Sequence, residues 1–276
     1  MNAPLVLDRH LPAHARARGE LRASFAASAG RTSIARVYEA GGLRLRFPRV
    51  AQGCEGVIVN TGGGIAGGDM AVLDFSAGTD TQVTLTTQAA EKIYRAQNVP
   101  ARIAVSLTAE AGAQLEWLPQ ETILFEGARL RRRLDLDAHD SARVTLLEST
   151  VFGRLAMGEA SISGLLTDRW RLRRDGKLVF AEDLRLDGGI GACLDRPACG
   201  AGARAAALLV HMAPDAEALL DPVRESLASA ACGAGASAWN GVLVVRLLSP
   251  SPVALRAAIV PLLEILRGRP APRVWQ

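Results

Sequence analysis

Lysine and aromatic residues are scarce in this sequence, and their scarcity limits what the protein can bind. Lys92 and Lys177 are the only lysines among 32 basic residues, so arginine carries nearly all of the positive charge. The six Phe, four Trp and two Tyr offer few surfaces for base stacking, and the formal net charge is only +4. No nucleic-acid-binding surface is therefore expected. The arginines suit paired carboxylate contacts at interfaces, although compositional bias is an alternative explanation of their number.

Paired cysteines, a secretory leader and a long apolar run are also missing from the sequence. The four cysteines stand apart without a C-x-x-C motif, at Cys54, Cys193, Cys199 and Cys232. We therefore expect free thiols and a cytoplasmic protein. The longest apolar stretch, residues 205–210, is far below the roughly 18 residues of a membrane span, so no contact with a membrane is expected. We expect residues 1–18 to be a flexible N-terminus and residues 19–276 to form a single domain.

Apolar and polar residues alternate through most of the chain, with the period of a half-buried strand. The alternation is clear in four segments, at residues 42–47, 81–87, 102–108 and 169–173. Within residues 129–137, Leu130, Leu134 and Leu136 fall on one face, and arginines and aspartates fall on the other. We interpret this arginine-rich stretch as the solvated face of a strand.

The apolar period becomes helical only near the end of the chain. Residues 214–230 space their apolar residues three and four apart, and Pro222 marks a point where the helix could kink or restart. A second helix is predicted to begin at Ser251, the N-cap before a proline, and to end at Gly268. Both helices lie in the last quarter of the sequence.

These patterns together predict the fold class. Many strands early in the chain and two helices late indicate a mainly β protein, a many-stranded mixed β structure with about two helices in the C-terminal quarter. Two stretches rich in small residues, 187–204 and 230–238, are interpreted as loops because of their turn-forming composition. Neither stretch is polar enough to indicate a linker between domains.

The segment NTGGGIAGGD, residues 60–69, contains a literal G-x-G-x-x-G. A dinucleotide fingerprint needs a helix after its glycines, because the helix N-terminus holds the pyrophosphate. Residues 70–75 alternate as a strand instead, and Asp69 stands where a P-loop requires lysine. We interpret the segment as a tightly turned loop that presents Asp69. Its glycines are Gly63, Gly64, Gly67 and Gly68.

Four segments, in order along the chain, are similar to motifs of one protein family. They are GGIAGGD at 63–69, TTQAAEKIYR at 86–95, LEWLPQETILF at 115–125 and FGRLAMGE at 152–159. By these motifs the sequence resembles the urease accessory protein D family, also called UreD or UreH. The resemblance runs from about residue 21 to residue 186 and more loosely to the C-terminus. The sequence departs from the family pattern at Thr61, Gly62, Gln88 and Glu91.

The resemblance implies a non-catalytic maturation factor with a mainly β fold. Such a factor docks on apo-urease and, with accessory proteins F and G, helps to deliver nickel to the urease active site. Two alternatives stay open. One is a nickel-binding storage protein, and the other is a cytoplasmic hydrolase built around His139 or His211, although the chain has no G-x-S-x-G elbow.

Imidazole and clustered thiols, the usual ligands of tight nickel sites, are scarce in this chain. His10 and His14 are four residues apart, but Pro12 between them argues against a helix that presents both. We therefore expect no tightly bound cofactor, and nickel only in transit. Carboxylates bind a divalent cation loosely. The family resemblance places candidate carboxylates at Asp69, Glu91, Glu148 and Glu182, with an ordinary salt bridge to arginine as the alternative for each.

A factor without an active site must act through contacts, so a large docking surface is expected. Trp117 and Phe125, with acidic residues beside them, are interpreted as an exposed apolar contact with a partner. The alternative is a core strand that turns at Pro119. The candidate interface residues are Trp117, Pro119, Glu121, Phe125 and Arg154.

Overall fold

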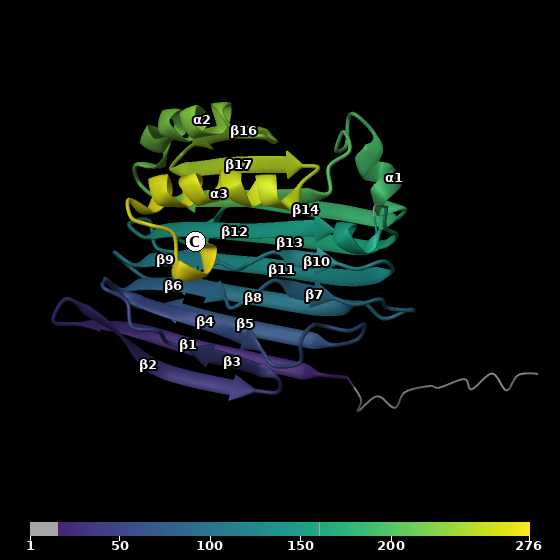
Figure 1. Ribbon diagram of the computed structural model, residues 1–276. Coiled ribbons are helices and arrows are strands. Elements are labelled where there is room, and N and C mark those ends of the chain that lie inside the picture. Colours follow the sequence, from purple (N-terminus) through teal and green to yellow (C-terminus); the bar gives the residue numbers. More distant parts are fainter. Residues whose placement is uncertain (1–15, 160) are drawn as a thin grey trace, which may run out of the picture.

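A computed structural model describes residues 16–159 and 161–276, and these residues form two stacked β-sheets and a layer of helices (Figure 1). Sheet A has seven strands in the order β14 (Lys177–Gly188), β13 (Gly164–Arg174), β11 (Ala128–Ala138), β8 (Ala101–Ala109), β5 (Met70–Ala77), β1 (Arg18–Ser28) and β2 (Arg31–Ala40). Sheet B has ten strands, eight of them in the order β16 (Gly233–Trp239), β17 (Val242–Ser249), β15 (Ala205–Met212), β12 (Arg143–Phe152), β9 (Gln114–Leu118), β6 (Gln82–Thr87), β4 (Cys54–Asn60) and β3 (Leu43–Arg46). The two short strands β10 (Thr122–Leu124) and β7 (Glu91–Ile93) extend sheet B beside β12.

The chain winds back and forth between the two sheets. From β4 to β13, successive long strands belong alternately to sheet B and sheet A. Each of these strands therefore pairs in parallel with the preceding long strand of its own sheet. In sheet A, β5 pairs with β8, β8 with β11, and β11 with β13. The colours of Figure 1 show this winding as a steady climb from the purple strands to the green ones.

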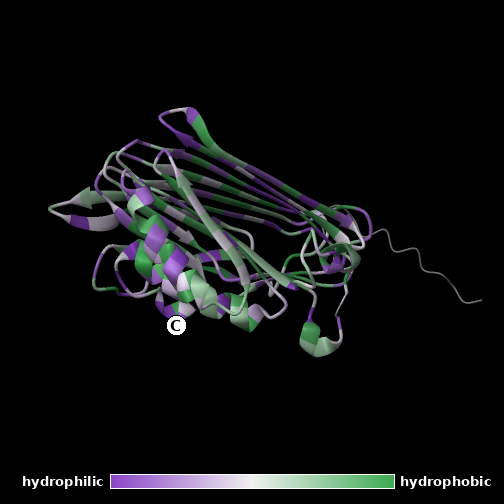
Figure 2. Ribbon diagram, turned by 90° about the horizontal axis from the view of Figure 1, so that it is seen from above, coloured by the Kyte–Doolittle hydropathy of each residue, from purple (hydrophilic) through white to green (hydrophobic). Residues whose placement is uncertain are grey.

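Helices cover the outer face of sheet B. They are α2 (Leu220–Ala228), preceded by the short helix η3 (Ala216–Leu219), and α3 (Pro252–Arg267). Helix α3 packs against β15 and β17, and α2 packs against β16. Figure 2 shows the helices gathered on one side of the strands.

The predicted ends of α3 are confirmed. The side chain of Ser251 accepts a hydrogen bond from the backbone N–H of Ala254 at 3.3 Å, so Ser251 is the N-cap. Pro252 occupies the first turn, where its missing N–H costs nothing. Gly268 ends the helix with φ of 61°, a left-handed conformation that glycine adopts readily.

Two apolar cores hold the three layers together. One core lies between the sheets and is filled by the inward residues of alternating strands, among them Phe75, Leu134 and Trp170. The other lies between sheet B and the helices, and it includes Leu255, Leu262 and other residues of α3. The predicted fold class, mainly β with two helices in the C-terminal quarter, is confirmed.

The C-terminal segment is fastened to sheet B by one aromatic residue and a charge cluster. Trp275, in the short helix η4 (Arg273–Trp275), is 1% exposed, and its indole N–H donates to the carbonyl of Leu118 at 2.9 Å. Arg267 and Arg269 both donate to the carboxylate of Glu116, at 2.9 and 3.1 Å. These contacts close the helical layer over β9.

Two of the predicted loops contain regular structure. The stretch 187–204 includes the short helix α1 (Ile190–Asp195), whose residues Ile190 and Leu194 lie one turn apart and are buried. The stretch 230–238 forms most of β16, which pairs antiparallel with β17. Glycine and alanine have low strand propensity. The backbone hydrogen bonds to the neighbouring strand β17 outweigh this low propensity. The loop prediction is therefore wrong for 230–238, and for 187–204 it fails at α1 but holds for residues 196–204.

The N-terminal prediction is only partly covered by the structure. Residues 1–15, with His10 and His14, lie outside the described residues. Arg18, which we placed in the flexible N-terminus, is the first residue of β1. Within the described ranges, no helix has both the length and the apolar character needed to cross a membrane.

Candidate functional site

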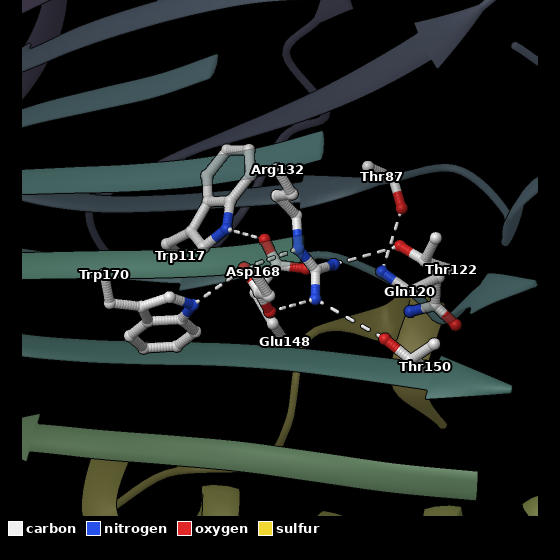
Figure 3. A network of polar contacts seen from close by, with 9 residues as sticks. All are labelled: Thr87, Trp117, Gln120, Thr122, Arg132, Glu148, Thr150, Asp168 and Trp170. Carbon is white, nitrogen blue, oxygen red and sulfur yellow. Dashed lines mark hydrogen bonds and ion pairs between the residues drawn. The ribbon is translucent and has the colours of Figure 1, made fainter. Parts of the chain in front are cut away.

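A buried arginine joins two carboxylates between the sheets (Figure 3). Arg132 points inward from β11 and bonds Glu148 of β12 on one side. On the other side it bonds Asp168 of β13, with Nη2–Oδ2 and Nε–Oδ1 distances of 2.5 and 3.1 Å. The Arg132 and Glu148 side chains are 3% and 4% exposed. One cation therefore meets two anions in the interior, which we call the Arg132 cluster.

Neutral donors and acceptors complete the Arg132 cluster. The indole N–H of Trp117 donates to Glu148 at 2.9 Å, and that of Trp170 donates to Asp168 at 3.2 Å. The hydroxyls of Thr122 and Thr150 accept from the guanidinium. These partners compensate the loss of water around buried charges.

The cluster retains an excess of one negative charge, and this alters its proton affinity. Burial raises the pKa of Glu148 above its usual range, an effect that Arg132 partly offsets. Burial also opposes the charge of Arg132, but Asp168 and Glu148 together hold the pKa of the guanidinium above its usual value. Arg132 therefore stays protonated, and Glu148 is the member poised to exchange a proton.

A small cavity adjoins the Arg132 cluster. Its volume is about 50 Å³, and Glu91, Gln120, Arg132 and Glu148 supply polar groups to its wall. The buried side-chain amide nitrogen of Gln120 has no hydrogen-bond partner among the described residues. The cavity is thus large enough for a water or a small ion, with a carboxylate at two points of its wall.

Glu91 lies at the glycine-loop side of this cavity. The side-chain amide of Asn60 donates to both of its oxygens, at 3.1 and 3.0 Å. Burial raises the pKa of Glu91, against the lowering effect of the Asn60 hydrogen bond. The half-buried Glu91 and the buried Glu148 are therefore two carboxylates with raised pKa values on one cavity.

Asp69 fastens the glycine loop. Its carboxylate accepts from the backbone N–H groups of Ala17 and Ala66, each at 2.8 Å. A second cavity of about 60 Å³ lies beside it, and Asn60 also lines this cavity. The two cavities share three wall residues, Leu43, Ile65 and Ala71. Asp69, Asn60, Glu91 and Glu148 therefore follow one another along two adjoining hollows.

Glu182 stands apart from the other three candidate carboxylates. It lies on β14 and forms an ion pair with Arg246 of β17, across the edge of the two sheets. It lines neither of the two cavities. For Glu182, the alternative of an ordinary salt bridge to arginine therefore fits the structure.

The glycine loop packs against an aromatic residue of the second motif. The hydroxyl of Tyr94 donates to the carbonyl of Gly63 at 2.9 Å. A Cβ atom at Gly64 would collide with the Tyr94 ring, so only glycine allows this close approach. The ring of Tyr94 in turn meets that of Phe125, with centroids 5.3 Å apart.

Phe125 connects these motifs to the fourth one. The guanidinium of Arg154 lies over the Phe125 ring, 4.1 Å from its centroid, and pairs with Glu159. The Arg154 hydrogen bond lowers the pKa of Glu159 to about 2. Tyr94, Phe125, Arg154 and Glu159 come from three motifs and form one partly exposed group, which we call the end cluster.

The candidate interface residues divide between the interior and the surface. Trp117 is 2% exposed and Pro119 is buried, so the alternative of a core strand and turn holds for them and corrects the expected exposed contact. Glu121 is partly exposed and pairs with Arg256 of α3 at 3.1 Å. Phe125 and Arg154 remain partly exposed, in the end cluster.

The alternating pattern of β11 already indicates that Arg132 points inward. Arg132 falls between Leu130 and Leu134, on the apolar face of the strand. Asp168 likewise falls between Leu166 and Trp170 on β13. A charged residue at an inward position is rarely buried unless it is paired, so these two residues could have been matched from the sequence.

Comparisons with known proteins agree with the motifs. A family model described as UreD urease accessory protein matches residues 17–276. Similar proteins include urease accessory protein UreD of Xanthobacter autotrophicus, 50% identical over 260 residues, which covers 94% of this chain and 90% of that protein. UreD of Methylobacterium sp. strain 4-46 is 51% identical over 253 residues, with 90% of each chain covered. UreD of Beijerinckia indica is 48% identical over 262 residues, with 94% and 97% covered.

Proposed function

The chain belongs to the UreD family of urease accessory proteins, and from this premise we propose that it is a non-catalytic scaffold for urease maturation. It binds apo-urease together with accessory proteins F and G, in the cytoplasm, and assists the delivery of nickel to the urease active site. The observation that carries the proposal is the family match over residues 17–276. The names of the relatives support the role in maturation.

The row of carboxylates along the two cavities supports passage of a divalent cation. Asp69, Glu91 and Glu148 offer oxygen ligands at successive points of the two hollows. The excess negative charge of the Arg132 cluster favours a cation over an anion there. In residues 16–159 and 161–276, no three His, Cys, Asp or Glu side chains gather as a metal site. Single carboxylates bind a cation weakly, which suits passage rather than storage.

The raised pKa values of two of these carboxylates support release of the cation. A proton competes with a metal ion for a carboxylate, so a raised pKa weakens metal binding at a given pH. Burial raises the pKa of both Glu91 and Glu148. Each of them would therefore exchange a cation for a proton more readily than an exposed glutamate.

The end cluster is the proposed contact with a partner protein. It exposes part of Tyr94, Phe125 and Arg154 on one end of the sheets, beside the glycine loop. Aromatic residues and arginine are enriched at protein interfaces. Glu121, on the nearby segment before β10, is the remaining interface candidate.

The experiment that tests passage compares two glutamates inside cells. Cells expressing the urease operon carry either Glu91→Gln or Glu182→Gln in this chain, and nickel is measured per purified urease. We expect Glu91→Gln to lower the nickel content, because Gln keeps the size of the side chain but removes its charge. Glu182→Gln is the matched control, since Glu182 lines neither cavity.

Three results would count against the proposal. Equal nickel content with Glu91→Gln and wild type would remove Glu91 from the route. Full nickel loading of urease in cells deleted for this chain would refute the maturation role itself. Tight stoichiometric nickel on the purified chain after dialysis would favour the storage alternative.

A further inference from the structure

In the part of the chain that the structure describes, no helix covers the outer face of the central strands of sheet A, unlike sheet B. The central strands β5, β8 and β11 expose alternate side chains there, and the packed helices contact sheet B and the edge strand β14. Three of the exposed residues are Arg102 of β8 and Arg131 and Arg133 of β11. We call these three residues the arginine row.

We propose that the arginine row is a docking surface for a short acidic segment of a partner protein that carries an apolar side chain between its carboxylates. The inference rests on the proposed function, because the partner is one of the proteins that the scaffold binds. The end cluster is a separate surface, formed by Tyr94, Phe125 and Arg154.

The strand register places two arginines side by side. Arg131 and Arg102 are direct partners across the parallel pair β11–β8. Both are exposed, and within the described residues neither has an ion pair with a carboxylate. Like charges directly opposite each other in a sheet are destabilising, so this pair costs stability until acidic groups approach it.

Three other arginines of the same face are paired within the chain, whereas Arg129, two residues from Arg131 on β11, has no ion pair among the described residues. Arg133 lies 3.3 Å from Asp135 of its own strand. Farther across the sheet, Arg169 and Arg171 both pair with Asp183 of β14. Arg102 and Arg131 are therefore among the arginines of this face that have no ion pair within the described residues.

A groove with an apolar floor runs beside the arginines. Its volume is about 350 Å³, and it is lined by the arginine row together with Met70, Val72 and Ala104. The register sets Met70 beside Arg102 and Val72 beside Ala104. These apolar residues are half-buried, so an aliphatic side chain could cover them while flanking carboxylates reach the guanidinium groups.

Acidic residues limit the length of any anion that could lie on this face. Ser106 lies two residues beyond Ala104 on β8, and its register partners are Asp74 of β5 and Asp135 of β11. Asp137 lies two residues beyond Asp135 on β11. A long polyanion such as nucleic acid would extend over these aspartates and be repelled. A segment with a few carboxylates would end before them, so the surface fits a protein partner.

The experiment measures binding of purified apo-urease and of purified accessory proteins F and G to this chain. One variant carries Arg102→Glu with Arg131→Glu. The matched control carries Arg36→Glu with Arg173→Glu, which makes the same change of charge on the same face near the other end of the strands. Affinities are compared at about 50 mM and about 300 mM salt.

We expect the Arg102/Arg131 variant to lose at least about tenfold in affinity for one of the three proteins, with a smaller loss for the control. The wild-type affinity for that protein should fall as salt rises, and the salt effect should shrink in the variant. Thermal unfolding of each variant provides the check that it is folded.

Different results separate the two proposals. If wild type binds a partner and both variants bind it equally well, the arginine row is not the docking surface, while the scaffold role stands. If wild type binds none of the three proteins, both proposals fail. If duplex DNA binds to wild type and is released by the Arg102/Arg131 change while protein binding is unchanged, the surface is a nucleic-acid site and the inference is overturned.

Discussion

Two buried charge clusters in this protein have opposite compositions. Between the sheets, one cation, Arg132, meets two anions, Glu148 and Asp168. Between sheet B and the C-terminal segment, one anion, Glu116, meets two cations, Arg267 and Arg269. The first cluster keeps an excess negative charge beside a cavity. In the second, at the margin of a layer, the buried carboxylate of Glu55 lies near both arginines and offsets their charge further. Their positions suggest different tasks, since buried charge is costly and is tolerated where it serves function or registry.

The Glu116 cluster attaches the C-terminal segment to sheet B. Its arginines come from the end of α3 and from the segment after it, so the ion pairs fix that segment against β9. Arg267 is nearly as buried as Arg132, at 4% against 3% exposed, but Arg269 is 20% exposed and reaches water. Removing the charge of Glu116 should therefore lower the free energy of unfolding less than removing the charge of Arg132.

The largest expected effect comes from Arg132→Met. The substitution keeps the bulk of the side chain but leaves Glu148 and Asp168 buried without a cation, and breaking a buried pair costs about 3–5 kcal/mol. Urea unfolding at neutral pH measures the change. Arg133→Met, at the exposed neighbouring position, should change stability by no more than about 0.5 kcal/mol. Equal losses in the two variants would contradict the account of the cluster.

A smaller loss is expected for Glu116→Gln. Glutamine can still accept hydrogen bonds, but Arg267 and Arg269 lose the carboxylate that both of them bond, and only Glu55 remains as a nearby anion, at a cost of about 1–3 kcal/mol. Limited proteolysis should cut the segment after α3 faster in the variant. Glu110→Gln, an exposed control, should leave both measurements unchanged. A loss as large as that of Arg132→Met would erase the distinction between the clusters.

A pH effect comes from a histidine close to the Glu116 cluster. His211 bonds Thr145 through Nδ1 at 2.9 Å, and burial, helped by Arg143, lowers its pKa to about 4, although Asp215 and Glu116 act in the opposite direction. Between about pH 6.5 and 4 the unfolded chain binds this proton and the folded chain does not, so stability falls as the pH falls. The slope is at most about 1.4 kcal/mol per pH unit.

The control for this pH effect is His211→Gln, which removes the titrating ring. Its stability curve, measured by urea unfolding across the same pH range, should be flatter than that of the wild type. Parallel curves for the two proteins would show that other groups cause the acid sensitivity. The comparison separates His211 from the carboxylates, whose own titration is common to both proteins.

The smallest expected effect lies on the exposed face of sheet A and has the opposite sign. Arg102→Glu turns the like-charge pair with Arg131 into an attractive one, so stability should rise by about 0.2–1 kcal/mol. The gain should shrink at high salt because exposed charges are screened. Thermal unfolding at two salt concentrations measures it. A loss of stability at low salt would mean that the two arginines do not repel each other.

Local patterns in the sequence were sufficient to predict much of the fold. Alternation identified strands such as β8 and β11, and the N-cap at Ser251 and the stop at Gly268 located α3. Such signals depend on a residue and its near neighbours. The strand β16 was missed because its stability comes from pairing with β17, which its own small residues do not reveal.

The candidate site was less predictable because it depends on contacts between distant residues. The motifs brought Glu91 and Glu148 into consideration, but only the fold places both on one cavity. The same fold separates Glu182 from them, since β14 carries it to the sheet edge beside Arg246. Trp117 was assigned to either core or surface because a single aromatic residue fits both. Its hydrogen bond to Glu148 depends on a residue 31 positions away.

The docking of Trp275 joins two segments that lie far apart in the sequence. Trp275 is buried and donates to the carbonyl of Leu118, 157 positions earlier in the chain. Until the segment after α3 reaches sheet B, the apolar surface that η4 covers is open to water. A folding intermediate that lacks this contact would therefore expose an apolar patch, and such patches favour self-association.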